Sequence, residues 1–114
     1  MLVLKYRLRK KKDFEKIYKL GKTTKQDFLL FRILENKIEN PRIGIVISKK
    51  TLSKATARNL VKRRIREAVR HFLPKISKNV DIIITACKGS SKEKSFEEIK
   101  TLIEQAFIKA KIII

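Results

Sequence analysis

The strongest restriction on the fold comes from residues 54–72, where a helix would have one hydrophobic face and one cationic face. The hydrophobic positions recur at the i, i+4, i+7, i+8 and i+11 spacing of a buried helical stripe, and they are Val61, Ile65, Ala68, Val69 and Phe72. The positions nearly opposite are polar or basic, and they are Asn59, Lys62, Arg63, Arg66 and Arg70. Such a helix packs its hydrophobic face on a core and turns its charge outward.

Basic residues are spread over the whole chain, which has 30 Lys and Arg against 11 Asp and Glu and a net charge of +19. Within residues 54–70 Glu67 is the single acid. Like charges one turn apart, such as Lys62 and Arg66, cost about 0.2–0.5 kcal/mol per pair. An anionic partner would offset this repulsion, with nucleic acid as the first candidate and an anionic membrane surface as the second. No run of residues reaches the length of a membrane span.

Periodicity and turn residues predict the elements of the first part of the chain. A short helix over about 10–20 ends at Gly21. Residues 27–35 are rich in β-forming side chains and predict a strand, with a short strand before it near 23–25. Residues 42–48 are apolar at nearly every position, as in a strand that is buried on both faces.

The long helix then starts at Lys54 or Thr56, with Ser53 as its candidate N-cap, and ends before Pro74. A second apolar strand follows over 80–86. This strand–helix–strand run has the spacing of a crossover unit with two parallel strands.

The last helix follows a capping box, with Ser95 as N-cap and Glu98 three residues later. The expected fold is therefore α+β, in the order α-β-β-β-α-β-α, with helices packed on one small four-stranded mixed sheet. The length predicts a single domain over residues 1–114.

Residues for autonomous catalysis are scarce. His71 is the single histidine, Cys87 the single cysteine, and no glycine-rich phosphate loop is present. Neither a disulfide within the chain nor a Cys/His metal site can be built from this set. We therefore expect no catalytic residue and no metal ligand. One cysteine and an N-terminus without a signal-peptide pattern favour the cytoplasm.

Two surfaces are candidates for binding. The first is the cationic side of the long helix, flanked by Lys49, Lys50 and Lys54. Arginine meets phosphate with two hydrogen bonds, and an asparagine can reach a base edge or a sugar hydroxyl.

The second candidate surface is aromatic. Phe14, Tyr18 and Phe31, bordered by Arg7 and Arg9, could stack on unpaired bases. Phe14 and Tyr18 stand at i and i+4, so packing of the first helix onto the sheet explains them as well, and the residues alone favour that interpretation.

The motif in the long helix resembles that of a known family. Residues 54–67 read K-A-x-x-R-N-x-x-K-R-x-x-R-E, and residues 44–50 read G-x-V-x-S-K-K. Together they are similar to the signature of the bacterial ribonuclease P protein subunit. The segments D-F-x-x-x-Y at 13–18 and D-I-I-I at 81–84 agree with the same family, so that the resemblance covers nearly the whole chain.

The resemblance implies a ribosomal protein S5 domain 2-like fold with a left-handed crossover, against the usual right-handed preference. It also implies a protein that binds a large catalytic RNA and helps to remove the 5′ leader of precursor tRNA. In that family the RNA carries the Mg²⁺ and the hydrolysis, so this chain would bind no cofactor itself. No DNA or membrane partner is implied. The alternative is a structural, ribosomal-type RNA-binding protein.

The charge pattern and the resemblance together give two sets of site residues. The residues expected to face the catalytic RNA are Lys54, Arg58, Asn59, Lys62, Arg63, Arg66 and Arg70. The residues expected to line a cleft for the single-stranded leader are Arg7, Arg9, Phe14, Tyr18, Phe31, Lys49 and Lys50.

Overall fold

Three α-helices pack on the two faces of a four-stranded sheet in the computed structural model, which describes residues 6–38, 40–76 and 79–113. The elements are α1 (Lys11–Leu20), β1 (Lys22–Gln26), β2 (Leu29–Glu35), β3 (Arg42–Ile47), α2 (Ala55–Phe72), the 3-10 turn η2 (Leu73–Lys75), β4 (Val80–Ala86) and α3 (Phe96–Lys109). The expected α+β fold and order of elements are confirmed.

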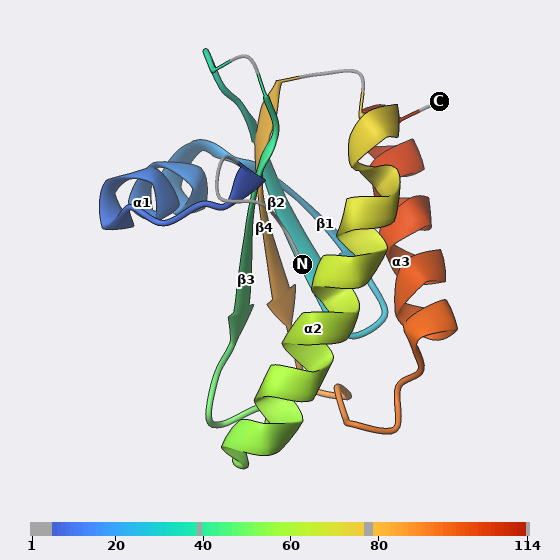
Figure 1. Ribbon diagram of the computed structural model, residues 1–114. Coiled ribbons are helices and arrows are strands. Elements are labelled where there is room, and N and C mark those ends of the chain that lie inside the picture. The colour runs from blue at the N-terminus through green and yellow to red at the C-terminus, as the bar shows by residue number, and fades with distance from the viewer. Residues whose placement is uncertain (1–5, 39, 77–78, 114) are drawn as a thin grey trace.

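The sheet is mixed and has the strand order β1-β2-β4-β3. β1 pairs with β2 and β2 with β4 in antiparallel fashion, whereas β3 and β4 are parallel. This confirms the crossover from β3 through α2 to β4, while its left-handedness stays a prediction. In Figure 1, α2 and α3 lie side by side on one face of the sheet, and α1 lies on the other.

Two hydrophobic clusters hold these layers together. The larger one lies between the sheet and the pair α2–α3, and it includes all five residues of the predicted stripe on α2. The smaller one lies under α1, where Ile17 packs with Leu8 and Ile83. β4 contributes to both clusters because it is central and buried along nearly its whole length. β3 is covered less fully than the sequence suggested, since Ile45 and Val46 are only half-buried.

Two local predictions differ from the structure. Ser53 does not cap α2, because Lys54 occupies the N-cap position and no side chain caps it. Instead the Arg58 guanidinium donates to the carbonyl oxygens of Leu52 and Ser53, at 2.8 and 2.9 Å, and so ties the start of the helix to the preceding loop. β2 starts at Leu29 rather than Asp27, since Asp27 has a left-handed backbone (φ 52°) in the turn from β1.

The predicted cap of α3 is confirmed, and it makes a testable contribution to stability. The Ser95 hydroxyl accepts a hydrogen bond from the Glu98 backbone N–H at 3.1 Å. We expect Ser95→Ala to lower the free energy of unfolding by about 1 kcal/mol, because an N-terminal donor of the helix loses its partner. Urea denaturation measures this. Ser53→Ala is the matched control and should stay within about 0.5 kcal/mol; equal losses in the two variants would contradict the assignment.

No helix in the described part of the chain combines the length and hydrophobicity needed to cross a bilayer.

Candidate nucleic-acid interface

The basic face of α2, by which we mean Asn59, Lys62, Arg63, Arg66 and Arg70, points away from the core. Burial of the opposite stripe fixes the rotation of the helix and so sets this orientation. Arg70 lies 3.9 Å from the Glu67 carboxylate. Within the described residues no carboxylate lies within ion-pair distance of the other cations on this face. These cations are thus available to an external anion.

The lysines at the start of this helix are held by a compact turn. The Ser48 hydroxyl lies 3.1 Å from that of Thr51, and the Ser48 carbonyl accepts from the backbone N–H groups of Thr51 and Leu52. Lys49 and Lys50 lie exposed in this turn, and Lys54 is exposed at the N-cap of α2. Arg58 differs from the other predicted cations, because it is half-buried and already donates to two carbonyls of the same loop.

The aromatic residues of α1 lie on the other face of the sheet. Tyr18 is 47% exposed, and the guanidinium carbon of Arg32 lies 4.8 Å from the centre of its ring. Phe14 is half-buried over Gly44, where an added Cβ would come within 2.7 Å of the phenyl ring. The glycine therefore lets the ring lie directly on β3.

Phe31 does not lie with Phe14 and Tyr18. Its side chain has no exposed surface, and its ring packs edge-on against Phe107 of α3 with centroids 6.1 Å apart. Successive side chains of a strand point to opposite faces, so Arg32 faces α1 while Phe31 faces the main core. We therefore leave Phe31 out of the candidate site.

Arg7 and Arg9 are placed by an extra backbone pairing. Arg7 bridges to Ile43 in parallel fashion, and the Leu8 N–H donates to the Ile43 carbonyl at 2.9 Å. This segment consequently runs along the free edge of β3, next to α1. Arg9 is exposed there, whereas Arg7 is half-buried.

We use the term α1 face for Phe14 and Tyr18 together with the half-buried sheet residues Leu30, Arg32 and Val46. Leu30 and Val46 share the sheet face of Arg32 and Gly44, two residues away along β2 and β3. Arg32 was missed in the sequence. The available signal was a charged residue within a run of apolar β-formers, which marks the side of the strand that is not fully buried.

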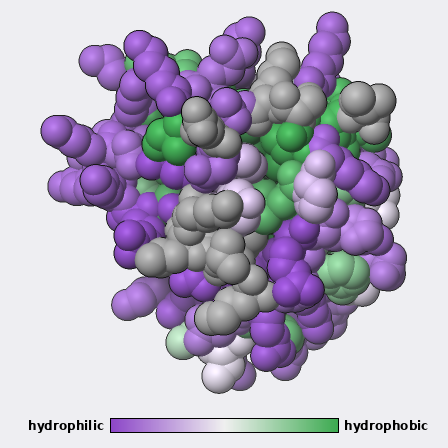
Figure 2. Space-filling model, turned by 45° about the horizontal axis from the view of Figure 1, so that its top comes forward, coloured by the Kyte–Doolittle hydropathy of each residue, from purple (hydrophilic) through white to green (hydrophobic). Residues whose placement is uncertain are grey.

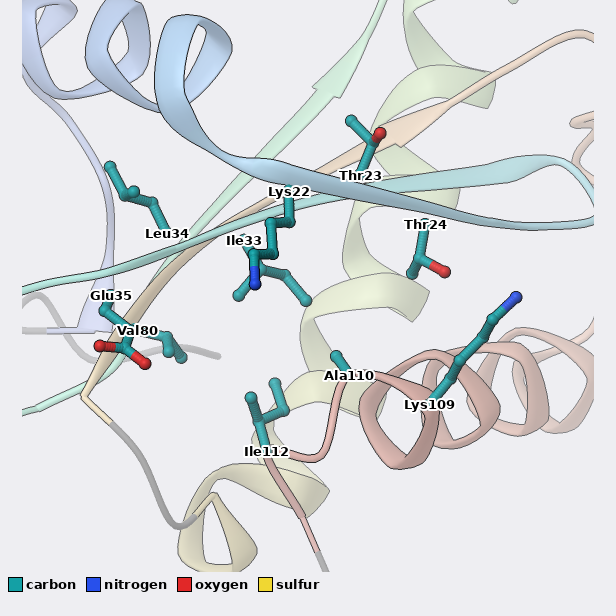
Figure 3. Close-up of a pocket in the computed structure, with 10 residues that line it drawn as sticks. All are labelled: Lys22, Thr23, Thr24, Ile33, Leu34, Glu35, Val80, Lys109, Ala110 and Ile112. Atoms are coloured by element: carbon teal, nitrogen blue, oxygen red, sulfur yellow. The ribbon is translucent and has the colours of Figure 1, made fainter.

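A cavity of about 580 Å³ lies elsewhere, between the β1–β2 hairpin and the end of α3. Figure 3 shows its lining, which includes the apolar residues Ile33, Ala110 and Ile112 and the lysines Lys22 and Lys109. None of the predicted site residues lines it. The residues expected to bind RNA therefore do not converge on this cavity.

Charge is distributed unevenly between the two helices that cover the main core. α2 carries six Lys or Arg and one Glu, for a net charge of +5, whereas α3 carries three Glu and two Lys, for a net charge of −1. The glutamates of α3 are exposed. On the face drawn in Figure 2, hydrophilic side chains project around smaller hydrophobic patches. No group of three His, Cys, Asp or Glu side chains in the described residues could hold a metal ion.

Comparison with known proteins identifies the family. The sequence model of the family described as Ribonuclease P matches residues 2–111. This chain belongs to the ribonuclease P protein family. It is thus a subunit of ribonuclease P, the endonuclease that matures tRNA 5′ ends, and a partner of the ribonuclease P RNA.

Relatives and solved structures agree with this membership. The chain is 42% identical over 98 residues to the ribonuclease P protein component of Clostridioides difficile, covering 85% of this chain and 84% of that protein. It is 36% identical over 106 residues to that of Synechocystis, covering 90% and 86%. The RNase P protein of Staphylococcus aureus superposes with a TM-score of 0.85 at 33% identity, covering 96% of this chain and 98% of that one. For the RNase P protein from Thermotoga maritima the TM-score is 0.80 at 30% identity, with 90% and 96% covered.

Proposed function

We propose that this ribonuclease P subunit binds two RNAs at once. The basic face of α2, with Lys54 beside it, binds the catalytic RNA through its phosphates. Lys49 and Lys50, which were expected from the sequence in the leader cleft, are exposed in the turn before α2, and we assign them to this surface instead. The α1 face, bordered by Arg9, binds the single-stranded 5′ leader of precursor tRNA. The observation that carries the proposal is that α1 and α2 lie on opposite faces of the sheet, so neither surface blocks the other.

The chemistry of the two surfaces supports this division. Unpaired cations on a helix suit a folded RNA, where the phosphates are dense and sequence matters little. An exposed tyrosine with an arginine behind its ring suits unpaired bases, which stack on aromatic rings and guanidinium planes. A precursor with a leader would then bind better than the mature product. This is differential binding and not chemistry on the protein.

We propose further that the RNA holds the Mg²⁺ ions and carries out the hydrolysis. The protein would reduce the repulsion between two polyanions and so lower the Mg²⁺ concentration at which they associate.

Reconstitution tests the proposal. Purified chain is added to ribonuclease P RNA and precursor tRNA at low Mg²⁺, and removal of the leader is followed with time. We expect cleavage to be stimulated, and we expect no cleavage when the RNA is omitted. A chain that bound RNA without stimulating cleavage would favour the structural, ribosomal-type role instead.

A further inference from the structure

A cluster of ionised side chains joins α1 to the sheet, on the same side of the sheet as the α1 face. The Arg42 guanidinium meets the Asp81 carboxylate with two hydrogen bonds, of 2.8 Å from Nε and 2.7 Å from Nη2. Its third nitrogen, Nη1, donates to Asp13 at 3.2 Å. The Asn36 amide also donates to Asp81, at 2.7 Å. Asp13 belongs to α1, whereas Arg42 and Asp81 lie opposite each other on β3 and β4.

This cluster is largely removed from water. The side chains of Arg42, Asp81 and Asp13 are 18%, 8% and 26% exposed. Hydrogen bonding to Asp81 raises the pKa of Arg42 above its ordinary value, despite the opposing effect of burial. Because two carboxylates share it, the guanidinium is neutralised within the protein and is a poor target for an RNA phosphate. Its contribution is therefore to the placement of other groups.

The cluster of Arg42, Asp81 and Asp13 lies next to the aromatic residues of α1 and can position them. Asp13 directly precedes Phe14, and Arg42 is two residues from Gly44, on which the Phe14 ring lies. Elsewhere this helix is held by hydrophobic contacts of Ile17 in the small cluster and by the contact of the Tyr18 ring with Arg32. Such contacts have little directional preference, whereas a guanidinium shared between carboxylates fixes distance and angle.

We propose that Arg42, Asp81 and Asp13 form a positioning cluster for leader binding, which sets how α1 lies on the sheet and so how Phe14 and Tyr18 face the RNA. The inference rests on the proposed role of the α1 face. The residues of the cluster act through α1 and do not contact the leader themselves.

Asp13→Asn tests the proposal, with Glu15→Gln as the matched control. Both changes remove one negative charge from α1, but Glu15 is an exposed residue, 3.9 Å from Lys11, and does not contact Arg42. The measured quantity is the affinity for precursor tRNA divided by the affinity for mature tRNA, in holoenzyme reconstituted with saturating protein. A loss of stability lowers the amount of assembled particle but leaves this ratio unchanged.

We expect Asp13→Asn to lower the ratio about five- to tenfold, the size expected for the net contribution of one ordinary hydrogen bond. Glu15→Gln should leave it unchanged, and Asp13→Glu, which keeps the charge, should recover part of it. An unchanged ratio in Asp13→Asn, together with a lowered ratio in Tyr18→Ala, would overturn the positioning role and leave the proposed function standing. An unchanged ratio in both variants would count against the proposed function itself.

Discussion

Changing Arg63 and Arg66 together to glutamine is expected to weaken binding to the ribonuclease P RNA by roughly 10- to 100-fold at moderate salt. Both residues lie on the basic face of α2 without an ion-pair partner among the described residues, so their charge is available to phosphate. Each phosphate contact contributes about −0.7 to −0.9 to the slope of log affinity against log salt. The double variant should therefore show a slope that is less negative by about 1.4–1.8.

Titrations of labelled RNA at several salt concentrations measure both quantities. Lys100→Gln with Lys109→Gln is the matched control, since it removes the same charge from α3, where the net charge is already negative. Equal losses in the two double variants would mean that the RNA responds to total charge and not to the basic face of α2. Arg58 is a poorer choice for this test, because its removal also frees two carbonyls of the loop before α2.

Tyr18→Ala is expected to reduce the preference of the holoenzyme for precursor over mature tRNA by about 5- to 100-fold. A stacked base contributes about 1–3 kcal/mol, and tenfold in affinity corresponds to about 1.4 kcal/mol. Tyr18 is the more exposed of the two aromatic residues on α1, and Arg32 supports its ring from the sheet. Binding of the protein to the catalytic RNA should stay unchanged.

Tyr18→Phe separates the contribution of the ring to leader binding from that of the hydroxyl. It keeps the aromatic surface and its contact with Arg32, so it should retain most of the preference for precursor. If Tyr18→Ala bound precursors with long and short leaders as tightly as the unchanged chain, stacking on this ring would play no part in leader binding.

Elements with a strong local pattern were predictable from the sequence. The stripe on α2 is buried as expected, because the hydrophobic periodicity from Val61 to Phe72 can be satisfied only by one rotation of the helix. The N-cap of α3 is likewise local, since Ser95 and Glu98 are three residues apart.

Features that depend on distant partners were not predictable. Phe31 faces α3 because β2 turns that side toward the main core, and the alternation along the strand does not by itself say which side this is. Arg42 contacts Asp13 and Asp81, which are 29 and 39 residues away in the sequence, and no local sequence pattern predicts contacts over such separations. The predicted N-cap of α2 was wrong because the helix starts one residue later than Ser53 allows, with Lys54 at the N-cap position.

The opposite net charges of α2 and α3, which lie side by side on one face of the sheet, give this helix layer an electrostatic dipole that points from α3 to α2. The field of a polyanion exerts a torque on this dipole, which turns α2 toward the polyanion and α3 away from it before any contact forms. A larger share of the collisions with the polyanion then involves α2, so the rate of productive encounter rises. This gain decreases as salt screens the field.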